Sequence, residues 1–222
     1  MKNILTKLIW PVAIAPAIYL ALVWNRLPGR IAMHFNLRGN PDRFGNKQEL
    51  ILLTVVFIVI NLLVYFLLTN IHRLDPKRYA ADNKERLRRI AFAVSVFMSA
   101  ILFAIIYSSI SGSTKPMMGF IFSGVGLLFA IIGNYLPNLK PNYFAGLRLP
   151  WTLEDPDNWK KTHALAGKLW FAGGLLLAII CLFTPPVVSI VIFFIVMAVI
   201  VIIPCIFSYR LFKQRKMTGA SH

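Results

Sequence analysis

Six long apolar runs divide this chain, and they constrain its fold more than any other feature. They cover residues 4–24, 50–69, 90–110, 117–136, 167–183 and 187–207. A helix needs roughly 20 apolar residues to cross the hydrocarbon core of a bilayer, and most of these runs reach that length. Only 14% of the residues are charged, against roughly 25% in an ordinary soluble domain. We therefore predict an all-α membrane protein, a bundle of about six transmembrane helices with short interfacial helices, rather than a soluble enzyme.

The first run has a competing interpretation as a cleaved signal peptide, because Lys2 and Lys7 give it a basic start. It is longer than the roughly 7–15 apolar residues of a signal core, and no clear cleavage site follows. It contains Pro11 and Pro16, which are expected to kink a helix. We interpret it as a kinked membrane helix.

The formal net charge of +16 raises the question of nucleic-acid binding, and the distribution of the charge answers it. Eighteen of the 24 Lys and Arg residues lie on the side of the N-terminus, and six lie on the other side. Cytoplasmic loops are enriched in basic residues, so this asymmetry predicts that both termini are cytoplasmic. The same cations attract anionic lipid headgroups. We therefore expect membrane lipids, and not nucleic acid, as direct partners.

Two predicted inner segments carry helix-start signals. Asp75-Pro76 and Asp155-Pro156 each place an Asp before a Pro, as expected of an N-cap followed by the first helical residue. Basic residues follow both pairs and lead into the third and fifth runs. These stretches either anchor the helices in lipid headgroups or form a surface that docks another protein.

Small and polar residues inside the runs indicate how the helices pack. Small residues recur in the fourth and fifth runs, at Gly119, Ser123, Gly124, Gly126, Ala130, Gly133, Gly167, Gly173 and Gly174. They predict closely packed helices, because small side chains let backbones approach one another in lipid. No Asp, Glu, Arg or His lies inside any run, which disfavours proton-coupled active transport and leaves a passive pore open. Asn61 and Asn134 are expected to cap helices or to form interhelical hydrogen bonds.

The outer loop, residues 25–49, is the first of two polar segments. Its candidate ligand-facing residues are His34, Asn36, Gly39, Asp42 and Lys47. Residues 39–42 read Gly-Asn-Pro-Asp, which is turn chemistry. His34, Asn36, Asp42 and Lys47 are expected to converge outside the membrane, either as structural hydrogen-bonding groups or as a binding site.

The inner loop, residues 137–166, is the second polar segment. The candidate residues in and beside it are Asn134, Asn142, Gly146, Arg148, Pro150, Trp151, Trp159 and His163. Arg148 beside Trp151 could stack on the indole ring or clamp an anion. The alternative is an interfacial loop that only holds the fourth and fifth helices. His34 and His163 are predicted on opposite sides of the membrane, roughly 30 Å apart at least, so we expect no metal site, cofactor or catalytic group.

The two loops together resemble the SdpI family of bacterial membrane proteins. The inner segment carries the resemblance in Gly-Asn-Tyr-Leu-Pro at 133–137, Lys-Pro-Asn at 140–142, Gly-Leu-Arg-Leu-Pro-Trp-Thr-Leu at 146–153 and Trp-Lys-Lys-Thr-His at 159–163. The outer segment, with His-Phe-Asn at 34–36, Gly39, Pro41-Asp42 and Lys47, is similar to the small membrane domain that commonly precedes it. Leu149 departs from the Thr or Ser expected there. The resemblance implies a two-helix domain at 1–70 and a four-helix SdpI-like domain at 71–222.

The resemblance also implies a function and a location. The founding member of the family protects a bacterium from its own secreted killing peptide, and it holds a small helix-turn-helix repressor at the membrane when the toxin is present. Many relatives are encoded without a toxin nearby. An immunity and signalling protein of the bacterial plasma membrane is thus the implied function, with a toxin outside and a repressor inside as partners. A passive transporter or channel and an accessory membrane subunit remain the alternatives.

Overall fold

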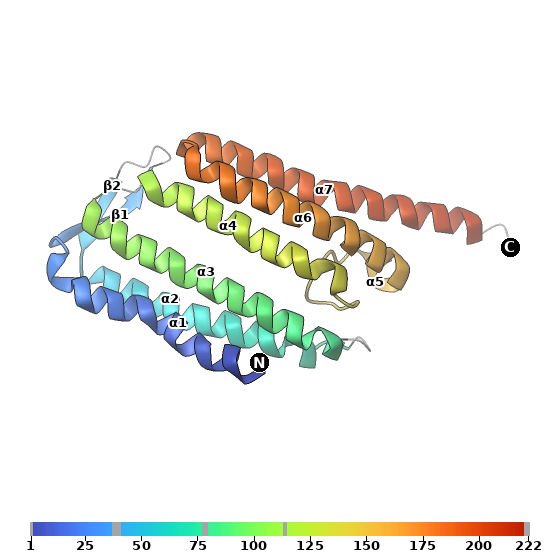
Figure 1. Cartoon of the computed structure of the whole chain (residues 1–222), viewed down its shortest axis with the longest axis horizontal. Coiled ribbons are helices and arrows are strands. Elements are labelled where there is room, and N and C mark those ends of the chain that lie inside the picture. The colour runs from blue at the N-terminus through green and yellow to red at the C-terminus, as the bar shows by residue number, and fades with distance from the viewer. Residues whose placement is uncertain (1, 37–40, 77–79, 113–114, 220–222) are drawn as a thin grey trace.

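The computed structural model describes residues 2–36, 41–76, 80–112 and 115–219. Its long helices are α1 (Lys2–Val23), α2 (Glu49–Asn70), α3 (Lys84–Ser111), α4 (Lys115–Tyr135), α6 (Pro156–Phe183) and α7 (Pro186–Gly219) (Figure 1). A short helix, α5 (Pro150–Glu154), precedes α6, and two strands, β1 (Arg30–Phe35) and β2 (Pro41–Asn46), lie between α1 and α2. Short 3-10 turns occupy Trp24–Arg26, Ile71–Arg73, Ala80–Asn83 and Leu136–Asn138. The six long helices are each long and apolar enough to cross a membrane, which confirms the predicted membrane bundle.

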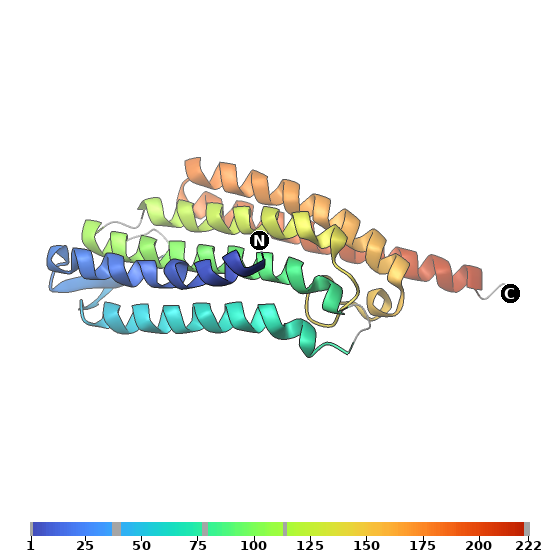
Figure 2. The same cartoon turned by 60° about the horizontal axis from the view of Figure 1, so that its bottom comes forward.

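The helices form two packed groups (Figures 1 and 2). Helix α3 packs against α1 and α2, whereas α4 packs along α6, and α6 also packs along α7. The β-hairpin lies at one end of the bundle, and α5 with the inner loop lies at the other. The outer and inner loops therefore sit at opposite ends of the helices, as the sequence predicts.

Glycines bring the backbones of α4 and α6 into direct contact. A Cβ atom on Gly126 would lie 2.5 Å from the Ala178 nitrogen, and one on Gly174 would lie 2.5 Å from the Ala130 nitrogen. A Cβ on Gly133 would meet the Phe171 nitrogen at the same distance. Such contacts leave no room for a side chain, so the small residues predicted to permit close helix packing do so along the α4–α6 contact.

A buried amide joins α2 to α3. The Asn61 amide nitrogen donates hydrogen bonds to the Ser95 carbonyl oxygen at 3.2 Å and to the Ser99 hydroxyl at 3.1 Å. This confirms the predicted interhelical hydrogen bond. Asn134, in contrast, is exposed near the end of α4.

The β-hairpin was not predicted from the sequence. Strands β1 and β2 pair antiparallel from Arg30 opposite Asn46 to Phe35 opposite Pro41, with irregular register on both sides of His34. Ile31 is buried beneath the hairpin in a cluster with Leu27, Leu50, Leu102 and Ile106. The buried Ile31 therefore fastens the hairpin onto the ends of α2 and α3. The residues at 30–35 and 41–46 do not alternate between apolar and polar types, so they lack the pattern that identifies a strand.

The two predicted helix starts have different outcomes. The Asp155 carboxylate accepts hydrogen bonds from the backbone nitrogens of Asp157 at 2.9 Å and Asn158 at 3.1 Å, which confirms it as the N-cap of α6. The prediction at Asp75-Pro76 is wrong, because Pro76 lies outside any helix and α3 begins at Lys84. The Asp75 carboxylate instead accepts a hydrogen bond from the Tyr143 backbone nitrogen at 2.8 Å. A long-range contact has replaced the local cap.

Candidate functional site

The outer polar residues come together only in part. His34 Nδ1 lies 2.6 Å from Asp42 Oδ1 across the hairpin, so the predicted convergence of these two side chains is present. Asn36 is exposed at the end of β1. The Lys47 ammonium lies 4.7 Å above the centre of the Trp24 ring, where a cation–π contact holds it. Gly39 lies outside the described residues.

His34 stands at the rim of a crevice that leads into the bundle. The crevice has a volume of about 330 Å³ and is walled by Met33 and His34 of the hairpin together with residues of α2, α3 and α4. A second, open hollow shares Met33 and His34 and adds Asp42 and Arg43. The outer end thus combines a charged rim with an apolar interior. This arrangement suits a ligand that has both polar and apolar parts.

Asn142 organises the first half of the inner loop. Its amide nitrogen donates to the carbonyl oxygens of Lys140 at 2.9 Å and Ala145 at 3.1 Å, and its amide oxygen accepts from the backbone nitrogens of Phe144 at 2.9 Å and Ala145 at 2.7 Å. The side chain is buried. One amide therefore forms hydrogen bonds with four backbone groups of this turn, where backbone groups need such partners.

Gly146 and His163 fix the second half of the loop. Gly146 has φ +101, and a Cβ there would lie 2.3 Å from His163 Nε2. His163 Nε2 accepts a hydrogen bond from the Leu147 backbone nitrogen at 3.0 Å. Nδ1 lies 2.8 Å from the Trp159 carbonyl oxygen. Because Nε2 faces a donor and Nδ1 faces an acceptor, these contacts require the neutral ring with its proton on Nδ1.

The Trp159 indole ring packs against the imidazole ring of His163. The two rings stack with their centres 3.9 Å apart, and the indole nitrogen donates to the Leu139 carbonyl oxygen at 2.7 Å. Both side chains are buried. His163 thus has the structural hydrogen-bonding role in the fold, between α6 and the inner loop.

The predicted pair Arg148 and Trp151 separates in the structure. Arg148 is exposed and donates to the Tyr143 carbonyl oxygen at 2.8 Å. The Trp151 ring stacks with Phe212 of α7, with ring centres 5.7 Å apart, and its nitrogen donates to the Ser208 hydroxyl at 2.8 Å. Trp151 therefore binds the loop to α7, while Arg148 faces outward.

Helix α5 begins without a side-chain cap from Leu149. Pro150 occupies its first turn, and the Thr152 hydroxyl accepts from the Leu149 backbone nitrogen at 2.9 Å and donates to the Leu147 carbonyl oxygen at 2.8 Å. Thr152 thereby closes the turn.

Several structural residues escaped the sequence interpretation. Asn83 at the start of α3 pairs with the backbone of Lys140, donating to its carbonyl oxygen at 3.0 Å and accepting from its nitrogen at 2.9 Å. Asn158 of α6 donates to the Ser208 carbonyl oxygen of α7 at 3.0 Å. These side chains join segments that are 57 and 50 residues apart in sequence. No local pattern identifies such partners.

Two family models and two known proteins match parts of this sequence. Residues 138–208 match the model of the SdpI/YfhL protein family, and residues 12–59 match a domain of unknown function (DUF1648). The chain is 27% identical over 189 residues to the immunity protein SdpI of Bacillus subtilis, covering 82% of this chain and 83% of that protein. The predicted resemblance to the SdpI family is confirmed. A 42-residue stretch, 19% of this chain, is also 40% identical to an uncharacterized protein of Archaeoglobus fulgidus and covers 23% of that protein. No solved structure matches significantly.

The SdpI/YfhL match contains the whole set of inner-loop candidates except Asn134. It also contains Ser208, the partner of Trp151 and Asn158. The second match, 12–59, lies within the predicted domain 1–70 and includes the entire hairpin. The SdpI/YfhL match therefore covers nearly all of the inner loop, and the second match covers the hairpin of the outer loop. Among the described residues, no group of three or more His, Cys, Asp or Glu side chains could hold a metal ion.

Proposed function

We propose that this protein is an immunity and signal-transducing protein of the bacterial plasma membrane, which protects the cell against a secreted membrane-active peptide. The supporting observation is its similarity to the immunity protein SdpI over 82% of the chain. In this proposal both termini are cytoplasmic, so the hairpin faces the toxin and the inner loop faces the cytosol. The cytosolic partner is a small helix-turn-helix repressor, which the protein holds at the membrane.

The toxin-facing site is the crevice at the outer end. An amphipathic peptide has apolar side chains that the interior can bury, beside backbone groups that the rim of His34 and Asp42 can bind. Burial of one large apolar side chain contributes roughly 1.5–3 kcal/mol. The peptide would gain this energy without leaving the membrane surface.

Helix α3 is the element that connects the two ends. Ile105, Ser108 and Ser109 near its outer end line the crevice, and Asn83 before its inner end pairs with Lys140 of the inner loop. A displacement of α3 by the peptide would therefore act directly on the inner loop. The peptide shifts the balance between two arrangements only by its difference in affinity for them.

The cytosolic readout is the exposed surface of the inner loop. Arg148 is exposed there, and its guanidinium holds the Tyr143 carbonyl oxygen. Tyr143 in turn donates from its backbone nitrogen to Asp75, in the segment between α2 and α3. A change at Asp75 would thus reach the surface offered to the repressor.

Survival under toxin challenge tests the proposal. Cells that express the protein and vector controls are exposed to the killing peptide against which SdpI of Bacillus subtilis protects. We expect protection by the wild type and its loss in Arg148→Ala. Arg210→Ala, an exposed arginine on α7, is the matched control and should protect. Full protection by Arg148→Ala, at equal membrane levels, would exclude the inner loop as the readout, and no protection by the wild type would overturn the immunity function.

Orientation can be measured separately. In a variant with Cys181 and Cys205 replaced by Ala, a cysteine at Arg43 should react from outside intact cells with a membrane-impermeant maleimide. A cysteine at Lys213 should react only after the cells are opened. The reverse labelling pattern would invert the proposed topology.

A further inference from the structure

Two hollows follow one another along the seam between α3 and α4. The first lies at the end of the bundle that carries the inner loop and has a volume of about 470 Å³. Its walls come from α3, from the segment after α4 and from the start of α6. Three cations line it, one from each of these segments: Arg86, Lys140 and Lys160. Trp159 closes its buried side.

The three cations of this basic pocket outnumber the one carboxylate in its wall. None of the ion pairs among the described residues involves Arg86, Lys140 or Lys160. Arg86 donates to a backbone carbonyl oxygen, that of Asp82. The acidic residue in the wall, Asp157, is bound by Arg215 of α7 at 2.8 Å. The pocket therefore presents net positive charge and favours an anion.

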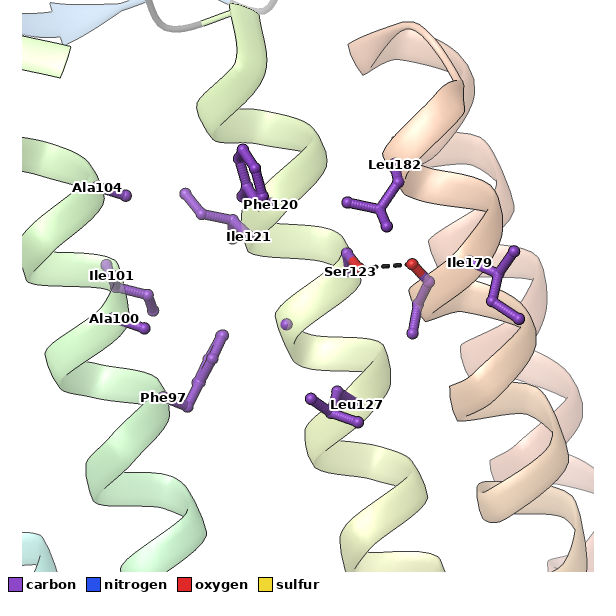
Figure 3. Close-up of a pocket in the computed structure, with 12 residues that line it drawn as sticks. Phe97, Ala100, Ile101, Ala104, Phe120, Ile121, Ser123, Leu127, Ile179 and Leu182 are labelled. Atoms are coloured by element: carbon purple, nitrogen blue, oxygen red, sulfur yellow. Dashed lines mark hydrogen bonds between the residues drawn. The ribbon is translucent and has the colours of Figure 1, made fainter. Parts of the chain in front are cut away.

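The second hollow is an apolar groove lined by residues of α3, α4 and α6 (Figure 3). It consists of two adjoining parts of about 570 and 370 Å³, which share Phe97, Ala100, Gly124 and Leu127. Figure 3 shows Phe97 and Ala100 of α3 on one side and Phe120 and Leu127 of α4 on the other. Ile179 and Leu182 of α6 also line the groove, next to the hydrogen bond that the Ser123 hydroxyl of α4 donates to α6. Apart from that hydroxyl, whose hydrogen bond goes to the Ala178 carbonyl oxygen, the lining side chains are apolar.

The length of the groove is close to the thickness of the hydrocarbon region of one leaflet. It extends along α3 from Phe92 to Ala104, which is about 18 Å at 1.5 Å per residue. Half of the hydrocarbon core is about 15 Å. About 9 Å of helix separates Arg86 from Phe92, which leaves space for the glycerol part of a lipid. The charged and apolar hollows thus have the order and spacing of a phospholipid.

We propose that this seam binds one anionic phospholipid of the leaflet at the inner-loop end, with its phosphate at Arg86, Lys140 and Lys160 and an acyl chain in the groove from Phe92 to Ala104. Basic pockets between transmembrane helices are a recognised form of headgroup site. The lipid would connect α3 to the inner loop and to α6. This binding is independent of whether the chain confers immunity.

Lipid titration of the detergent-purified full chain tests the site. Binding of phosphatidylglycerol, phosphatidylcholine and inorganic phosphate is followed by native mass spectrometry. We expect one tightly bound phosphatidylglycerol, and roughly 30-fold weaker binding in Lys140→Gln/Lys160→Gln, because each lysine charge strengthens headgroup binding about fivefold. The double variant Lys161→Gln/Lys213→Gln removes two exposed lysines outside the pocket and should bind like the wild type.

A second pair of variants tests the acyl-chain part. Ala100 is exposed and lines both parts of the groove, so Ala100→Trp fills it without entering the core. Ala172→Trp makes the same change on an exposed residue of α6 outside the groove. We expect weaker phosphatidylglycerol binding only in Ala100→Trp, with both variants eluting as the wild type does in gel filtration.

Four results would overturn the assignment. Equal losses in the two lysine double variants would mean unspecific attraction to a basic surface. Binding of phosphatidylcholine as tight as that of phosphatidylglycerol would remove the role of charge. Displacement of the lipid by inorganic phosphate, with no effect of Ala100→Trp, would show a phosphate site without a chain. Tight binding of polyglutamate through the same lysines, with no retained lipid, would identify a surface for an acidic protein segment.

Discussion

Replacing Gly146 with alanine should open the inner loop while leaving the helices intact. The expectation rests on two separate effects at one position. Gly146 has φ +101, and a residue with a Cβ loses about 1–2 kcal/mol in the left-handed region. The new methyl group would also lie 2.3 Å from His163 Nε2, so the imidazole ring must move away.

The second effect can be assigned to a particular hydrogen bond. Movement of the ring breaks the contact between the Leu147 nitrogen and His163 Nε2, now 3.0 Å. A buried donor left without an acceptor costs about 1–3 kcal/mol. Together the two effects amount to about 2–5 kcal/mol, so the open form of the loop should become at least 30-fold more populated.

Trypsin cleavage after Arg148 provides the assay. Cleavage follows the population of the open form when the loop recloses faster than the enzyme cuts, so the rate should rise at least 30-fold in Gly146→Ala. Gly29→Ala is the control, because a Cβ at Gly29 meets nothing within 4 Å. In a His163→Ala background the clash and the hydrogen bond are both absent, and only the backbone cost of about 1–2 kcal/mol should remain. A cleavage rate unchanged by Gly146→Ala would refute this account of the loop.

Three further predictions concern the bundle and the hairpin. Asn61→Leu should lower the free energy of unfolding in mixed micelles by about 0.6–1.7 kcal/mol, the range for interhelical hydrogen bonds in lipid; a loss above about 3 kcal/mol would point to another role. Gly126→Leu should abolish the monodisperse gel-filtration peak, because even a Cβ would lie 2.5 Å from the Ala178 nitrogen; a normal peak would contradict the backbone contact of α4 and α6. His34→Ala should leave thermal stability unchanged, since its contact with Asp42 is solvent-exposed and exposed polar pairs contribute little, yet reduce protection in the survival assay; unchanged protection would remove His34 from the proposed site.

The sequence predicts the helices of this protein better than its loops. Long apolar runs in lipid have essentially one solution, since every backbone group must be bonded within the segment. The observed helices accordingly cover the six runs to within one residue, and several extend beyond them: α3 begins at Lys84, six residues before the apolar run at 90–110. The apolar run marks only the part of a helix that lies in lipid. In the polar interface a helix can continue with charged residues, so its first turn lies before the run.

The loops depend on contacts that no local pattern encodes. Asp155 caps α6 as predicted, yet the identical Asp-Pro pair at 75–76 does not begin a helix, because Tyr143 supplies a distant partner for the carboxylate. His163 was anticipated as a candidate, but its bond to the Leu147 nitrogen depends on the turn at Gly146. The hairpin escaped prediction because its most deeply buried residue, Ile31, gives no periodic signal by itself.

The length of α7 has a mechanical consequence for the end of the bundle that carries the inner loop. Its 34 residues measure about 51 Å, whereas the hydrocarbon core is about 30 Å thick. The last turns therefore leave the lipid as a continuous helix, and the Arg215 bonds to Asp155 and Asp157 brace them against the start of α6. A flexible tail of the same residues would sample all directions. A braced rod instead holds its end at one point, so a fluorescent group attached near Lys216 would report the tilt of α7 directly.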